Sequence, residues 1–267
     1  MNAKTIELEL NGRPVLALEG ETLLELADRH GVDIPRLCHK PGYRPDGNCR
    51  ACMVEIDGER VLAPSCCRTA APGMKVHADS PRAVKSQNMV LEMLLSDLPE
   101  QGYKWLGDDA TRPHGELSDW AARQSVRVRP ALAAISRTRR AAPSVLDPLG
   151  GRAGHSPAQG ALTHRTQPAP DVSHPAMAVN LDACIQCKRC VRACREEQVN
   201  DVIGYAWRGQ HAKIVFDCDD PMGASSCVGC GECVQACPTG ALMPRLLGAG
   251  AAPDGDAARV APRAAQR

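Results

Sequence analysis

The sequence is poor in aromatic residues, with one Phe, three Tyr and three Trp among its 267 residues. A chain of this length can form two small domains, but it has little aromatic volume with which to fill their cores. Metal-sulfur bonds that form on folding can replace part of a missing hydrophobic core, and the chain has fourteen cysteines. We therefore expect bound metal to contribute to the stability of the protein.

Long apolar stretches are also absent. No segment approaches the roughly 18 apolar residues of a membrane span, and the first ten residues alternate polar and apolar side chains, unlike a signal peptide. We expect a cytoplasmic location and no membrane insertion, so that a reducing environment keeps the thiols from forming a disulfide framework. The formal net charge of +1 gives no strong field for nucleic acid, and no nucleic-acid partner is expected.

The first cysteine block lies within a predicted unit of short strands and one helix. Strands are expected over 5–10 and 15–18, a helix over 21–30, and a hairpin from 53–56 and 60–62. The loop between the helix and the hairpin contains Gly42 and Gly47. Glycines there would let backbone amides turn toward sulfur atoms.

The spacing of the cysteines in this block fits a 2Fe-2S cluster, although its first gap is longer than in the plant-type pattern. The predicted ligands are Cys38, Cys49, Cys52 and Cys66. Cys67 is the spare thiol, because successive extended residues point in opposite directions and only one of the adjacent pair can face the cluster. A structural zinc site that uses the same four thiolates is the alternative.

The second cysteine block contains two runs with the spacing C-x2-C-x2-C-x3-C, and a proline follows the second run. This duplicated pattern is typical of bacterial two-cluster ferredoxins, in which the fourth cysteine of each run ligates the other cluster. The predicted ligands are Cys184, Cys187, Cys190 and Cys237 for the first 4Fe-4S cluster, and Cys227, Cys230, Cys233 and Cys194 for the second. Zinc is disfavoured because structural zinc sites usually take two well-separated pairs.

Other residues of this block are given no ligand role. Cys218 matches neither run and is interpreted as an ordinary thiol. Strands are expected over 199–205 and 213–216, between the two runs. Four basic residues surround the first run and could favour the reduced, more negative state of a cluster, but we interpret them as a solvated face. They are Lys188, Arg189, Arg192 and Arg195.

These features divide an α+β chain into five parts. We expect an N-terminal β-grasp 2Fe-2S ferredoxin-like domain at 1–80, a helical connector at 81–136, a flexible linker at 137–175, a double 4Fe-4S ferredoxin-like domain at 176–247 and a disordered tail at 248–267. The connector should begin with an amphipathic helix over 81–98, because Ser80 is a favourable N-cap and Pro81 suits the first helical position.

Three stretches resemble the N-terminal iron-sulfur portion of the alpha subunit of NAD-dependent molybdenum or tungsten formate dehydrogenases. They are the cysteine pattern of the first block, the segment KSQNMVLEMLLSDLPE, and the stretch from SHPAMAVNLDACIQCKRCVRACREEQVNDVIGYAWRG through ECVQACPTGALMP. The arrangement is also similar to the corresponding part of respiratory complex I and to the small diaphorase subunit of NAD-reducing hydrogenases. The resemblance implies electron transfer through one 2Fe-2S and two 4Fe-4S clusters, with a molybdenum or tungsten pterin catalytic subunit and a flavin-containing NAD-reducing subunit as partners.

The chain departs from these families in two respects. They commonly carry a His-x3-Cys-x2-Cys-x5-Cys ligand set after the connector helix, whereas no cysteine lies between Cys67 and Cys184 here. His114 lies in that region and is interpreted as an ordinary solvated histidine. The formate dehydrogenases also continue into a pterin-binding domain, whereas the sequence ends at Arg267, so we expect no catalytic centre in this chain.

The expected function is therefore that of an electron-transfer subunit or segment of a formate dehydrogenase. No catalytic residue is predicted, because neither paired carboxylates nor a Gly-rich phosphate loop stand out. One alternative is a stand-alone ferredoxin-like carrier or the small diaphorase subunit of an NAD-reducing hydrogenase. Another is a zinc-stabilised interaction module without a redox role.

Overall fold

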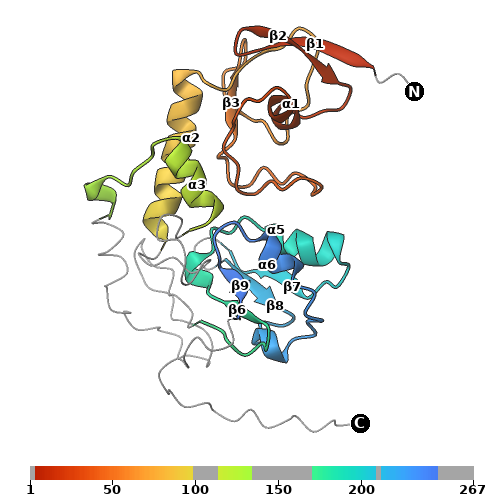
Figure 1. The fold of residues 1–267 in the computed structure, drawn as a ribbon, viewed down its shortest axis with the longest axis vertical. Helices are drawn as coiled ribbons and strands as arrows, with labels where there is room; N and C mark the ends of the chain where they lie inside the picture. The colour runs from red at the N-terminus through yellow and green to blue at the C-terminus, as the bar shows by residue number, and fades with distance from the viewer. Residues whose placement is uncertain (1–3, 99–113, 134–169, 209–211, 246–267) are drawn as a thin grey trace.

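The computed structural model describes residues 4–98, 114–133, 170–208 and 212–245. Figure 1 shows an N-terminal sheet unit at the top, a C-terminal unit below it, and two connector helices beside them. Most of the predicted linker and the whole predicted tail at 248–267 lie outside the described residues. Within the described ranges, no helix has the length and apolar character needed to cross a bilayer.

The N-terminal unit is a mixed five-stranded sheet with the strand order β2-β1-β5-β3-β4. Its strands are β1 (Thr5–Leu10), β2 (Arg13–Leu18), β3 (Met53–Ile56), β4 (Ala63–Pro64) and β5 (Lys75–His77). β1 and β2 are antiparallel, and β1 and β5 are parallel. Asn11 and Gly12 join the first two strands with φ angles of 51° and 73°, the left-handed conformation that suits a two-residue hairpin turn.

The predicted hairpin after the cysteine loop differs in its second strand. β3 pairs with Ala63–Pro64, not with residues 60–62, and Val61 is 59% exposed. This register lets the Ser65 amide donate to the Cys52 carbonyl at 3.0 Å. The longer connection therefore brings the chain around Cys66 back to Cys52. β5 was not predicted from the sequence, because a three-residue strand is too short to show alternation.

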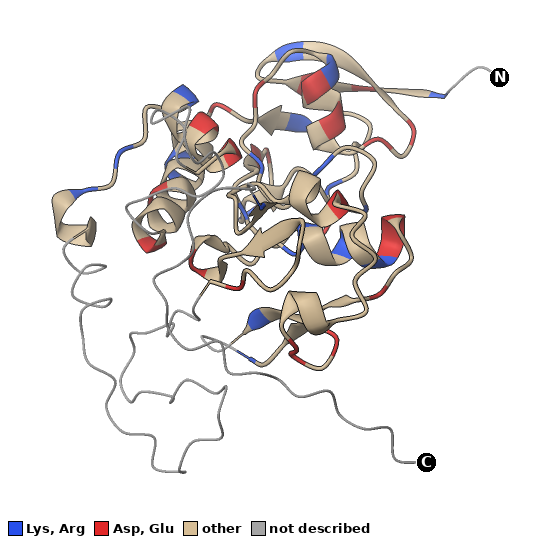
Figure 2. Ribbon diagram, turned by 60° about the horizontal axis from the view of Figure 1, so that its bottom comes forward, with Lys and Arg blue, Asp and Glu red and all other residues tan. Residues whose placement is uncertain are grey.

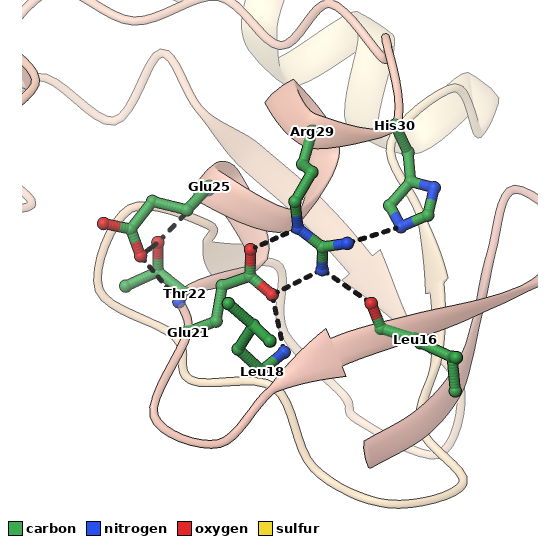
Figure 3. A network of polar contacts seen from close by, with 7 residues as sticks. All are labelled: Leu16, Leu18, Glu21, Thr22, Glu25, Arg29 and His30. Atoms are coloured by element: carbon green, nitrogen blue, oxygen red, sulfur yellow. Dashed lines mark hydrogen bonds and ion pairs between the residues drawn. The ribbon is translucent and has the colours of Figure 1, made fainter. Parts of the chain in front are cut away.

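Helix α1 (Leu23–Arg29) packs against this sheet through Leu23, Leu24, Leu26 and Ala27. Its first turn is stabilised by a capping box, in which Thr22 accepts from the Glu25 amide and the Glu25 carboxylate accepts from the Thr22 amide. Figure 3 shows a second network, in which Arg29 donates to both carboxylate oxygens of Glu21 at 3.0 and 2.7 Å and to the Leu16 carbonyl at 2.6 Å. These contacts tie the end of the helix to β2.

Glu21→Gln is expected to lower the free energy of unfolding by about 1 to 3 kcal/mol at neutral pH, because it removes a charge-assisted pair. The hydrogen bonds from Arg29 lower the pKa of Glu21 below 4.5, although burial opposes them. The stabilisation is therefore present above about pH 4.5 and is lost as the pH falls through the lowered folded-state pKa. Urea unfolding of the fully metallated protein should show this difference in the free energy of unfolding at neutral pH, and a smaller difference at acid pH. Glu19→Gln, which breaks the exposed pair with Lys4, is the control, and equal losses in both variants would contradict the prediction.

The connector helices are α2 (Pro81–Asp97) and α3 (Glu116–Arg123). The predicted helix over 81–98 is confirmed to within one residue, and the Ser80 side chain accepts from the Ala83 amide at 3.1 Å. Gln87 is buried and donates to the carbonyls of Met53 and Ala78 at 2.8 and 3.2 Å, which attaches α2 to the sheet unit. Leu91 from α2 and Leu117 from α3 belong to a core that extends into the C-terminal unit.

The C-terminal unit contains two separate strand pairs and short helical turns. The pairs are β6 (Met177–Val179) with β9 (Leu242–Pro244), and β7 (Ile203–Ala206) with β8 (Lys213–Phe216). The helices are α5 (Arg189–Arg192) and α6 (Glu232–Ala236), with a π turn at Ala193–Glu197 and 3-10 turns at Leu181–Ala183 and Met222–Ala224.

Two boundaries of this unit differ from those predicted. The strand expected over 199–205 begins only at Ile203, because Val199 and Asp201 have positive φ angles of 53° and 52° that interrupt extended backbone. At the N-terminal end, Asp171 pairs with Val179, and His174 is 7% exposed. The ordered unit thus begins before residue 176.

Part of the loop that carries the first cysteine block packs in the core of the C-terminal unit, whereas Cys52 and Cys66 pack in the core of the sheet unit. Leu37 and Ala51, from the loop between α1 and β3, pack in the same cluster as Cys184, Cys190 and Cys237. In Figure 1 this loop extends from the sheet unit down toward α5. Figure 2 shows acidic and basic residues interspersed over both units, as expected for a net charge of +1. The cysteine blocks are therefore in direct contact, although more than a hundred residues separate them along the chain.

Candidate metal centres

The first centre is formed by the loop after α1 and the segments that flank β3 and β4. Cys38, Cys52 and Cys66 are at most 1% exposed, and Cys49 is half-buried. The Cys38 amide donates to the Cys49 sulfur at 3.4 Å. Hydrogen bonds with the thiols of Cys49 and Cys66 lower the pKa of Cys38 to about 2, while those with Cys38 and Cys52 raise the pKa of Cys66. The structure thus brings the four predicted ligands together.

Cys67 lies next to this group but is exposed. Its sulfur is 3.6 Å from the Cys66 sulfur, which is fully buried. A Cβ atom at Gly47 would approach the Cys67 sulfur to 2.9 Å, so the glycine allows the loop to pass close to this thiol. The adjacent cysteines therefore differ in burial as expected, but the premise of extended backbone was wrong, because residues 65–67 form a turn in which the Cys67 amide donates to the Pro64 carbonyl at 3.0 Å.

The second and third centres are two cavities in the C-terminal unit. One is lined by the predicted first set, Cys184, Cys187, Cys190 and Cys237, together with apolar residues such as Ile185, Ile214 and Leu242. The other is lined by the predicted second set, Cys194, Cys227, Cys230 and Cys233. Each cavity thus contains three cysteines of one run and the fourth cysteine of the other. Cys218 is exposed and lines neither cavity.

The two runs share a backbone geometry that turns amides toward the sulfurs. Gln186 and Lys188 in the first run have positive φ angles of 56° and 59°, and the equivalent residues of the second run, Gly229 and Gly231, have angles of 71° and 78°. The Gln186 amide donates to the Cys184 sulfur at 3.4 Å, and the Gly229 amide donates to the Cys227 sulfur at the same distance. Such amides stabilise the negative charge of metal-bound sulfur.

The electrostatics of the cavities favour a bound cation. Burial and the neighbouring thiols of Cys187 and Cys184 raise the pKa of Cys190. Burial together with Cys227 and Cys230 raises the pKa of Cys233 to about 12. Four thiolates cannot share such a space unless positive charge compensates them, and iron would supply it. The donor sets therefore fit iron-sulfur clusters, whose binding would displace the thiol protons.

The two sets differ in their exposure to solvent. All four cysteines of the first set are buried, whereas in the second set Cys230 is exposed and Cys227 is half-buried. Val228, between these two, is 69% exposed. The second cavity is therefore the one that lies closer to the protein surface.

The expectation of a solvated basic face around the first run was wrong for two of its four residues. Arg189 and Arg192 are each 3% exposed, because the loop that carries Cys38 covers this face of α5. Arg189 pairs with Glu116, and Arg192 donates to the carbonyls of Cys38 and Arg44. The expectation for His114 was also wrong, since this histidine is 7% exposed.

The residues that join the two units were not predicted from the sequence. The Tyr43 hydroxyl and the Lys40 ammonium donate to the Glu232 carboxylate at 2.7 and 3.0 Å, and the Asn48 side chain donates to the Gln186 carbonyl at 2.6 Å. Each contact links residues about 140 or more positions apart in the chain. No local pattern could have indicated these pairs.

Comparison with known proteins identifies two domains. Residues 3–81 match the family of 2Fe-2S iron-sulfur cluster binding domains, and residues 183–241 match the family of 4Fe-4S dicluster domains. Both matches contain the predicted ligand sets of their blocks. The intervening residues lie outside both matches.

Similar curated proteins come from several enzyme classes. NADP-reducing hydrogenase subunit HndD of Solidesulfovibrio fructosivorans is 29% identical over 89% of this chain and 36% of its own length. A subunit of the NADH-quinone oxidoreductase of Rhizobium meliloti is 31% identical over 84% of this chain and 22% of its own length. A Staphylococcus haemolyticus protein provisionally named as a formate dehydrogenase is 25% identical over 88% of this chain and 20% of its own length. The chain thus spans between a fifth and just over a third of these relatives.

A similar solved structure supports the fold. A chain from the crystal structure of an NAD+-reducing NiFe-hydrogenase in its H2-reduced state has a TM-score of 0.67 at 22% identity, with 90% of this chain and 87% of that chain covered. The resemblance stated from the sequence is therefore confirmed. The chain therefore contains a 2Fe-2S cluster binding domain followed by a 4Fe-4S dicluster domain, and it is similar in sequence to hydrogenase, NADH-quinone oxidoreductase and provisionally named formate dehydrogenase proteins.

Proposed function

We propose that this chain is the electron-transfer subunit or segment of a cytoplasmic NAD-dependent formate dehydrogenase. It would connect a molybdenum or tungsten pterin subunit, which oxidises formate, with a flavin-containing subunit that reduces NAD. When bound, one 2Fe-2S and two 4Fe-4S clusters would supply one-electron carriers. The observation that carries this proposal is the presence of three groups of four cysteines, two in the C-terminal unit and one in the segments whose loop packs against that unit.

The residues around the three groups suit such a relay. The Cys38 loop packs against the helix that carries Cys190, which keeps the first two groups adjacent. The exposed Cys230 makes the third group accessible to a partner. The chain itself buries the cysteines of the first 4Fe-4S group, and in both cysteine runs backbone amides donate to sulfur.

A second candidate is the small diaphorase subunit of an NAD-reducing hydrogenase, or a free ferredoxin-like carrier. The hydrogenase chain matches this one along most of both lengths, 90% and 87%, whereas the formate dehydrogenase relative extends well beyond the matched region. In this case the partner would oxidise hydrogen instead of formate. The roles of the cysteine groups would be the same.

The proposal predicts that the chain alone neither oxidises formate nor reduces NAD, and that it restores formate-dependent NADH production to a complex that lacks it. Cys230→Ala should abolish NADH production while formate oxidation with an artificial dye persists, because dye reduction at the pterin subunit does not need the relay. Both activities should be measured with and without the chain. Hydrogen-dependent NADH production instead would support the second candidate, and full formate-dependent production in the absence of the chain would refute the relay.

A further inference from the structure

Two buried arginines lie between the first cysteine group and the second. Arg192, on α5, donates through Nη2 to the carbonyl of Cys38 and through Nη1 to the carbonyl of Arg44. One guanidinium therefore binds the loop at a predicted 2Fe-2S ligand and again six residues later. Because the fork of a guanidinium is planar and rigid, it holds both carbonyls in one arrangement.

Arg189, one turn earlier on α5, contacts the same loop. It donates to the Leu37 carbonyl at 3.3 Å and forms a two-pronged pair with Glu116 at 2.6 and 3.0 Å. Burial alone would lower the pKa of Arg189, but Glu116 and the nearby thiols of Cys187 and Cys237 outweigh that effect. Arg189 thus lies between the first 4Fe-4S cysteine group and the residue that precedes Cys38.

Glu116 extends this connection to a third element. It begins α3, and its amide donates to the carbonyl of Pro238 at 2.9 Å, directly after Cys237. Its carboxylate meets Arg189 on α5. The connector helix, the first cysteine run and the end of the second run therefore meet at one ion pair, in which Arg189 is buried and Glu116 is partly exposed.

Burial of two guanidinium groups costs free energy, because each charge loses its hydration. The Nε atoms of both arginines are buried and have no hydrogen-bond partner among the described residues. The contacts described for Arg192 are with carbonyl oxygens, not with a carboxylate. Negatively charged thiolate-bound clusters on both sides would compensate these charges better than the protein groups alone do.

We propose that Arg189 and Arg192 are positioning residues that bridge the loop of the 2Fe-2S centre to the helix of the first 4Fe-4S centre and hold the two centres at a fixed separation. The proposal rests on the proposed function, because a fixed separation matters only if electrons pass between the centres. The contacts of Asn48 with Gln186 and of Tyr43 with Glu232 lie at the same interface. Within this interface, Arg189 donates to the carbonyl of Leu37 and Arg192 donates to the carbonyl of Cys38.

Arg192→Ala tests the bridge in the isolated, reconstituted chain. We expect an unchanged iron content, a loss of magnetic interaction between the reduced 2Fe-2S and 4Fe-4S centres in electron paramagnetic resonance, and faster amide hydrogen exchange in residues 37–51. Arg195→Ala is the matched control, since it removes the same charge from an exposed side chain that pairs with Asp201. The control should retain the wild-type interaction and exchange. Equal behaviour of the two variants would overturn the proposal.

Arg192→Lys distinguishes the effect of the two hydrogen bonds of Arg192 from the effect of its positive charge. Lysine keeps the positive charge but cannot present a planar fork to two carbonyls, so the magnetic interaction should again weaken and exchange in the loop should again increase. Wild-type behaviour of this variant would overturn the bridge in favour of a purely electrostatic role. The same variant decides the matter if Arg192→Ala fails to retain iron.

These measurements need no partner subunit and no formate. A wild-type chain whose centres interact magnetically, but which fails to support NADH production, would refute the proposed function and leave the bridge intact. Normal magnetic interaction and loop protection in Arg192→Lys would refute the bridge and leave the proposed function intact. The two failures are therefore distinguishable.

Discussion

Cys66→Ala is expected to abolish the 2Fe-2S centre, whereas Cys67→Ala should retain it. The Cys66 sulfur is fully buried among the thiols of Cys38 and Cys52, and the neighbouring Cys67 is exposed. Alanine is preferred to serine in both variants because it offers no oxygen that could replace the lost thiolate. Reconstituted wild-type protein should contain about ten iron atoms, and the Cys66 variant about eight.

The two variants form a matched pair, since each removes one of two adjacent thiols. Iron and sulfide analysis gives the stoichiometry, and electron paramagnetic resonance distinguishes the 2Fe-2S signal from the 4Fe-4S signals. The 4Fe-4S signals should survive in both variants, because those ligands lie in separate cavities. Loss of the 2Fe-2S signal in Cys67→Ala with its retention in Cys66→Ala would reverse our assignment of the ligand.

Variants that test the predicted exchange of fourth cysteines in the C-terminal unit have a larger expected effect on iron content. Cys187 and Cys237 line the same cavity, so the double variant Cys187→Ala/Cys237→Ala should lose one 4Fe-4S cluster and retain about six iron atoms. Cys230 lines the other cavity. The double variant Cys230→Ala/Cys237→Ala should therefore lose both clusters and retain about two iron atoms.

Comparison of the two double variants tests the exchange directly. If each run instead supplied all four ligands of its own cluster, the iron contents of the two double variants would be interchanged. Cys218→Ala should retain about ten iron atoms, because this exposed thiol lines neither cavity. Iron and sulfide analysis under anaerobic conditions measures all three variants.

The contact between the cysteine blocks affects how these variants should be interpreted. Leu37 and Ala51 share a core with Cys184 and Cys190, so loss of a cluster on one side removes support from the other side. Metal-binding free energy in small cluster domains contributes to folding free energy. We therefore expect the variants that lose a cluster to unfold at lower urea concentration, even where the remaining clusters stay bound.

Most of the candidate ligands could be predicted because their pattern is local. Cys184, Cys187 and Cys190 are spaced so that one turn of chain can present all three sulfurs to one cluster. The capped start of α2 was predicted for a similar reason, since Ser80 and Pro81 act on neighbouring amides. Short strands such as β5 and β6 were missed, because three residues carry no periodic signal and their pairing depends on distant segments.

The sequence by itself determined the cysteine groups and the order of the two domains, because each depends on residues close together in the chain. Only the tertiary structure decided that the two blocks touch and that Arg189 and Arg192 are buried. The four basic residues around the first run would have the same sequence pattern whether this face of α5 were exposed to solvent or covered by another segment. The arginines are covered by the loop at residues 37–51, whose backbone carbonyls accept hydrogen bonds from arginines 148 to 154 positions away in the sequence. Backbone carbonyls occur at every residue, so no residue type in that loop indicates which of them an arginine will bind.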